Sequence, residues 1–163
     1  MIDKRVLTEK FKIVGMYNAD ISSEEYPIIG VQSLATCVGI LLYSPKYQKA
    51  IVAHAATEYF PILMEVLDLL FENKMDDSPI KYLVIPGFYY NHYEVAENLQ
   101  KAFSSLYPLF VPFSSEEILE GIIKDPELPA YQFAFDASRG IFVSEEVLYG
   151  ADYDIIHNNK KFF

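Results

Sequence analysis

The chain has 163 residues, of which 52% are hydrophobic and 15% aromatic, so it carries enough apolar material for one packed core. This composition excludes a disordered or a fibrous protein. The formal net charge of −10 opposes binding to nucleic-acid phosphates and to anionic lipid headgroups, and we expect no nucleic-acid partner.

No repeat, low-complexity tract or linker divides the sequence, so we expect a single domain over residues 1–163. The first ten residues lack the apolar region of a secretory signal peptide. The longest apolar stretches fall short of the ~20 residues that a membrane-spanning helix needs, so no membrane insertion is expected. We therefore expect a cytoplasmic protein, or one delivered as an effector without a signal peptide.

The first half of the chain alternates short apolar runs with turn residues, a pattern typical of β-strands. The expected strands are residues 11–17, 27–32, 38–43 and 50–55. The last two flank a turn at residues 44–47 and predict a hairpin. The apolar residues after Thr57 recur with helical spacing and predict a helix that reaches about residue 73. Thr57 is a suitable N-cap for it, because its hydroxyl can accept a hydrogen bond from the first turn.

The second half predicts strands that alternate with helices and end in a hairpin. The expected elements are a strand at 82–85, a helix from Asn91 to about residue 106, a strand at 109–111, a helix from Ser115 that stops before Asp125, and strands at 131–135 and 141–144. Gly140 suits the positive φ of the turn in that hairpin. Together these elements predict an α/β or α+β fold, a mixed sheet with helices packed against it.

Cys37 and His54 form the one pair of side chains that predicts a chemical function. With a four-residue loop at 44–47, Tyr43 pairs with Gln48 and Cys37 lies directly opposite His54. Opposed residues have Cβ atoms ~4.5–5.5 Å apart, so the sulfur and an imidazole nitrogen could form a hydrogen bond. A free thiol with a pKa of ~8.5 is only a few per cent thiolate at neutral pH, and an adjacent imidazole can accept its proton.

The alternative interpretation is structural. A single cysteine in an apolar run is often a packed core residue, and a histidine can equally be buried with its hydrogen bonds satisfied. A shift of the hairpin register by one residue would also place Cys37 and His54 on opposite faces of the sheet.

At these residues the chain resembles the CheD family of chemoreceptor glutamine deamidases. The family pattern is a Thr-Leu-Gly-x-Gly-Ser-Cys-Val segment, an apolar strand, an Asp-Pro turn and a His after small apolar residues. The corresponding stretches are Val31-Gln-Ser-Leu-Ala-Thr-Cys37-Val38, Leu41-Leu-Tyr-Ser-Pro45 and Ile51-Val-Ala-His54. The separation between the cysteine and the histidine matches without a gap. The likeness covers roughly residues 11–145 and implies a CheD-like sandwich fold.

The resemblance also implies roles for individual residues. Cys37 would be the nucleophile and His54 the base, while backbone N–H groups near Thr36 and Cys37 would stabilise an oxyanion. The family's catalytic threonine aligns with Val31, which has no hydroxyl. Either Ser33 or the backbone carbonyl of Val31 could orient the imidazole instead, the latter as a main-chain group does in the similarly folded cytotoxic necrotizing factor toxins.

The function that this resemblance implies is a protein-glutamine deamidase, which converts a Gln side chain to Glu and releases ammonia. No metal or organic cofactor is expected, and the partner would be a protein substrate, either a chemoreceptor or a host protein. Two alternatives stay open. One is a catalytically inactive CheD-like interaction module, and the other is a different thiol-dependent amide hydrolase or a transglutaminase.

Overall fold

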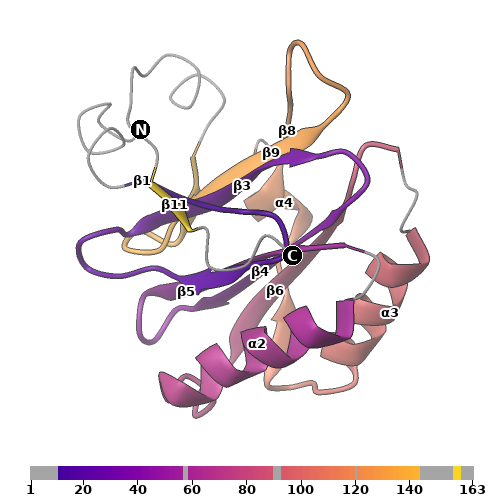
Figure 1. Ribbon diagram of the computed structural model, residues 1–163. Helices are drawn as coiled ribbons and strands as arrows, with labels where there is room; N and C mark the ends of the chain where they lie inside the picture. The colour runs from indigo at the N-terminus through magenta and orange to yellow at the C-terminus, as the bar shows by residue number, and fades with distance from the viewer. Residues whose placement is uncertain (1–10, 57–58, 90–92, 120, 144–155, 159–163) are drawn as a thin grey trace.

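Two β-sheets stack face to face, and two helices cover the outer face of one of them (Figure 1). The computed structural model describes residues 11–56, 59–89, 93–119, 121–143 and 156–158. Both sheets contain parallel and antiparallel pairs of strands. The expectation of an α+β fold with mixed sheets and packed helices is confirmed.

The first sheet, here called sheet A, has the strand order β10-β9-β3-β1-β11, with β8 paired to β9. β1 runs parallel to both β3 and β11, whereas β3, β9 and β10 pair antiparallel. The strands are β1 (Phe11–Val14), β3 (Ile28–Leu34), β8 (Ile123–Lys124), β9 (Tyr131–Asp136), β10 (Ile141–Phe142) and β11 (Ile156–Asn158).

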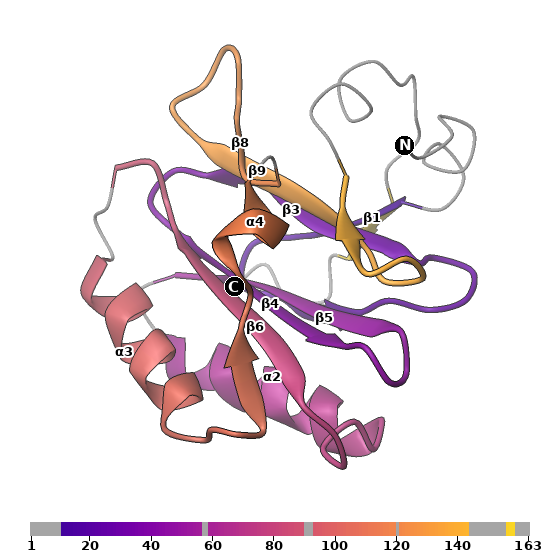
Figure 2. The ribbon, with the colours of Figure 1, turned by 180° about the vertical axis from the view of Figure 1, so that it is seen from behind.

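The second sheet, sheet B, has the order β2-β5-β4-β6-β7 and carries the predicted hairpin at its centre. Seen from behind, β4, β5 and β6 cross the middle of the molecule between sheet A and the helices (Figure 2). The strands are β2 (Ala19–Ile21), β4 (Val38–Ser44), β5 (Lys49–Ala55), β6 (Ile80–Pro86) and β7 (Phe110–Pro112). Because sheet B is covered on both faces, β4 is buried along its whole length, as its almost uninterrupted apolar sequence requires.

The two faces of sheet B belong to two separate hydrophobic cores. Residues 38, 40, 42, 51, 53 and 55 pack against the helices α2 (Tyr59–Glu72) and α3 (Tyr93–Ser104). Residues 37, 41, 43, 50, 52 and 56 pack against the inner face of sheet A. The period of two along each strand therefore assigns Cys37 to the core between the sheets.

Most predicted elements are confirmed, with ends that move by a few residues. The predicted caps Thr57 and Asn91 lie outside the described residues. The predicted helix from Ser115 is much shorter than expected: α4 (Ser115–Ile118) starts at a capping box in which Ser114 and Glu117 bond to each other's backbone N–H groups. The chain then turns into β8, whose Ile123 is buried and pairs with Gln132, because strand pairing buries this segment better than a longer helix would.

In the part of the chain that is described, no helix is long and apolar enough to cross a membrane.

Candidate functional site

The register of the central hairpin differs from the prediction. Gly39, and not Cys37, lies opposite His54, and Ser44 pairs with Lys49. The predicted register is wrong by two residues because the strand continues through Ser44 and the turn closes over 45–48, where Gln48 adopts a positive φ of 51°. A shift of two residues preserves the face on which a side chain lies. Cys37, the residue just before β4, and His54 therefore both face sheet A, but they are offset by two residues along the hairpin rather than directly opposed.

The backbone of His54 is fixed by the turn that follows β1. The His54 N–H donates to the Asn18 carbonyl oxygen at 3.0 Å, and the His54 carbonyl oxygen accepts from the Tyr17 N–H at 2.8 Å. The turn itself is held by the Asn18 side chain, which donates to the Met16 carbonyl oxygen at 2.9 Å and is fully buried. Tyr17 adopts a positive φ of 63° in this turn. The turn brings the end of β1 in sheet A against β5 in sheet B.

The imidazole of His54 has one ring nitrogen bonded and one free. It donates a hydrogen bond to the backbone carbonyl of Val14, which raises its pKa, whereas Nε2 is buried and has no hydrogen-bond partner in the described structure. The bond to Val14 is therefore made by Nδ1–H, which fixes the tautomer and leaves the Nε2 lone pair available. A buried ring nitrogen without a partner is uncommon and costs stability, which makes it a candidate for a functional atom.

Cys37 lies in the connection between β3 and β4, with 5% of its surface exposed. This connection packs tightly against the end of β6: a Cβ on Gly87 would lie 2.7 Å from the Cys37 carbonyl oxygen. The N–H groups of residues 88 and 89 donate to the carbonyl oxygens of residues 34 and 35. Close backbone packing leaves room for glycine alone at position 87 and holds the cysteine at the rim of the core between the sheets.

Burial dominates the protonation of both groups. Burial raises the pKa of the Cys37 thiol, and a side-chain hydrogen bond with Thr36 lowers it by a smaller amount. Burial lowers the pKa of His54 to about 4, against the opposing effect of the bond to Val14. Neither group contributes to the pKa shift of the other. At neutral pH the resting site therefore holds a neutral thiol and a neutral imidazole rather than an ion pair.

The two residues predicted to orient the imidazole lie elsewhere. Val31 is fully buried in β3, where it pairs with Phe133 of β9. Ser33 is exposed and adopts a positive φ of 60°. The backbone carbonyl of Val14 accepts the imidazole hydrogen bond that was expected from Ser33 or from the carbonyl of Val31. Any residue at position 14 carries this backbone carbonyl, so the sequence contains no pattern that predicts Val14 as the acceptor for the imidazole.

Thr36 also has a contact that the sequence analysis did not predict. Its side chain hydrogen-bonds to the thiol of Cys37, whereas the resemblance implies a role only for its backbone N–H. The role of the N–H groups of Thr36 and Cys37 in an oxyanion site stays a prediction. Among the described residues, no group of three or more His, Cys, Asp or Glu side chains is arranged to hold a metal ion.

Comparison with protein families and with curated sequences finds no match. No protein-family model matches the chain, and no curated protein matches its sequence. The resemblance to the CheD family therefore stays a prediction that rests on the residues quoted above.

Proposed function

We propose that this chain is a thiol-dependent protein-glutamine deamidase with Cys37 as the nucleophile and His54 as the base. The observation that supports the proposal most strongly is the state of the His54 imidazole. Its Nδ1–H is held by the Val14 carbonyl, and its Nε2 is unpartnered on the same face of sheet B as Cys37. A base whose imidazole is oriented by a third group, and which lies on the same sheet face as a thiol, supports a role in nucleophilic catalysis.

The reaction would start from the neutral pair. As the Cys37 sulfur attacks the carboxamide carbon of a Gln side chain, its proton passes to Nε2 of His54 and a tetrahedral oxyanion forms. When this intermediate collapses, the C–N bond breaks, the imidazolium returns the proton to the leaving nitrogen, and ammonia departs. Water then attacks the thioester while His54 accepts its proton, and collapse releases Glu and restores the thiol.

The pKa values give the pair a specific mode of action. A His54 pKa of about 4 leaves Nε2 unprotonated at neutral pH, but the same burial makes the imidazole a weak base. The thiol proton therefore moves to Nε2 only as the sulfur bonds to the substrate carbon. The raised pKa of Cys37 keeps the thiol protonated until a substrate arrives. The proposal is therefore general-base catalysis, in which proton transfer accompanies attack, and not a preformed thiolate.

A second candidate function, a non-enzymatic interaction module with the same fold, is favoured by the burial of the pair. A thiol with 5% exposure and a raised pKa is typical of a structural cysteine. In that case the Cys37 and His54 side chains would serve only to fill the core between the sheets. The partner would then bind elsewhere on the surface.

A substrate-like electrophile distinguishes the two functions. The probe is a short peptide, acetyl-Ala-Gln-Gly-amide, in which a chloromethyl ketone replaces the carboxamide of Gln. We expect a covalent adduct at Cys37, detected by mass spectrometry, with a rate that saturates as the probe concentration rises. The adduct should be absent in Cys37→Ala and at least about tenfold slower in His54→Gln, as expected for loss of a general base. Ammonia release from the unmodified peptide should follow the same order.

Ser33→Ala is the matched control, because Ser33 is exposed and does not bond to the imidazole. It should react at the wild-type rate, whereas a large loss would return the orienting role to Ser33. Labelling that never saturates, and that proceeds equally fast in His54→Gln, would contradict the deamidase and support the interaction module. Circular dichroism of each variant separates a chemical defect from a failure to fold.

A further inference from the structure

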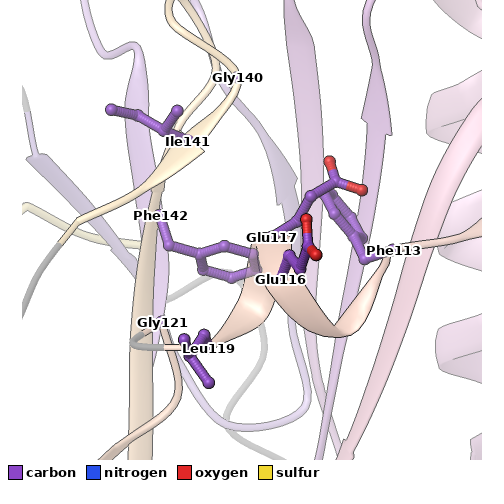
Figure 3. A pocket seen from close by; sticks show the side chains of 8 residues that line it. All are labelled: Phe113, Glu116, Glu117, Leu119, Gly121, Gly140, Ile141 and Phe142. Atoms are coloured by element: carbon purple, nitrogen blue, oxygen red, sulfur yellow. The ribbon is translucent and has the colours of Figure 1, made fainter.

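A pocket with a volume of about 330 Å³ lies between α4 and the edge strand β10 (Figure 3). The rings of Phe113 and Phe142 form its aromatic floor, and their centroids are 5.6 Å apart. Phe142 also packs against Phe135 of β9, so the floor is part of the core between the sheets and is well fixed. The volume is within the range of small-molecule and side-chain binding sites.

The rim of the pocket combines acidic and apolar side chains. Glu116 and Glu117 come from α4, and their carboxylates lie beside the aromatic floor in Figure 3. Leu119 is 79% exposed and Ile141 is 43% exposed, which is a high exposure for apolar residues. A rim of this kind is complementary to a ligand that carries a positive charge next to an apolar group.

One cation of the chain already shows how this rim binds an ammonium group. The Lys81 Nζ forms an ion pair with the Glu117 carboxylate and lies 5.7 Å from the centroid of the Phe113 ring. Carboxylate and aromatic face thus act together on a single ammonium. Glu116 is exposed and forms no ion pair with any described residue, so a second carboxylate is available beside the Phe142 ring.

We propose that this pocket binds a lysine or arginine side chain, flanked by an apolar residue, from a surface segment of a partner protein. The charged head would pair with Glu116, its aliphatic stem would lie on the Phe142 ring, and the flanking apolar residue would contact Leu119 and Ile141. The net charge of −10 attracts a basic partner at long range, and the pocket supplies the specific contact.

This inference goes beyond the proposed deamidase and does not depend on it. Lys81, beside the pocket, pairs with Tyr43 at one end of β6, whereas Pro86, at the other end, pairs with Val38 next to Cys37. At ~3.3 Å per residue, the five steps from Lys81 to Pro86 separate the two sites by about 17 Å along β6. Loss of binding here would therefore leave the chemistry of Cys37 on a small peptide unchanged.

The test is an NMR titration of the full chain with the peptide acetyl-Gly-Leu-Lys-Gly-amide at low ionic strength. The signals of Leu119, Gly121 and Phe142 should shift and saturate. A matched peptide with norleucine in place of Lys keeps the aliphatic stem without the charge and should bind at least about fivefold more weakly. Glu116→Gln should weaken the lysine peptide by about two- to fivefold, the range expected for one exposed ion pair.

Glu97→Gln is the control variant, because Glu97 is an exposed acid on α3 and its loss changes the net charge equally. It should leave the affinity unchanged. The proposal is overturned if the norleucine peptide binds as tightly as the lysine peptide, or if Glu97→Gln weakens binding as much as Glu116→Gln does. Absence of a saturable shift at the pocket residues would overturn it as well.

Discussion

The buried neutral imidazole of His54 predicts a loss of stability in mild acid. Burial lowers its pKa in the folded protein from 6.5 to about 4. Above pH 6.5 the imidazole is neutral in both states and has no effect. As the pH falls below 6.5, the unfolded chain binds a proton that the folded chain does not, so the free energy of unfolding decreases. The full effect is about 3 kcal/mol below pH 4, of which about 2 kcal/mol is already present at pH 5.

Urea denaturation at pH 7 and pH 5 measures this effect when wild type is compared with His54→Gln. The variant cannot titrate at position 54, and the other histidines and the acidic residues contribute equally to both proteins. The loss of stability between pH 7 and pH 5 should therefore be about 2 kcal/mol larger in wild type than in the variant, whatever the variant's stability at pH 7.

Equal pH dependence in the two proteins would contradict the reasoning. It would mean that His54 has an ordinary pKa in the folded protein, and hence that its ring is hydrated or paired with a carboxylate. A variant that lost more stability in acid than wild type would imply that His54 is protonated in the folded protein. That result would also remove the basis for general-base catalysis from a neutral imidazole.

Three further predictions follow from the contacts of single residues. Because burial raises the pKa of Cys37, iodoacetamide should alkylate the native protein more slowly than the urea-unfolded chain. The plot of alkylation rate against pH should have its midpoint above that of free cysteine, and a midpoint below it would contradict the burial of the thiol. Gly30→Ala would put a Cβ 2.1 Å from the Phe133 carbonyl oxygen, so it should lower the free energy of unfolding by about 1–3 kcal/mol or more. An unchanged midpoint of urea denaturation would contradict the close packing of β3 on β9. Ser114→Ala removes the capping box of α4 and should cost up to about 1 kcal/mol, whereas Ser114→Asp should retain most of it in thermal unfolding.

The hairpin illustrates how far the sequence pattern reaches. The alternation in 38–43 and 50–55 predicted both strands and, through their period of two, the face that Cys37 and His54 share. It could not fix which residues are opposed, because that depends on how the turn closes, and Gln48 carries no sequence signature of a positive φ. The short strands β2 and β8 escaped prediction for a related reason: segments of two or three residues owe their conformation to the strand beside them.

The sequence by itself determined the apolar periodicities, and through them an α+β fold, the main helices and the common face of the candidate pair. These are local properties, because a side chain's direction follows from its position in its own strand or helix. Only the tertiary structure decided that the Val14 carbonyl, from the other sheet, holds the His54 imidazole, and that burial keeps both groups of the site neutral. The physical reason is that hydrogen bonds between sheets and the loss of solvation depend on atoms contributed by distant segments, and no window of sequence contains them.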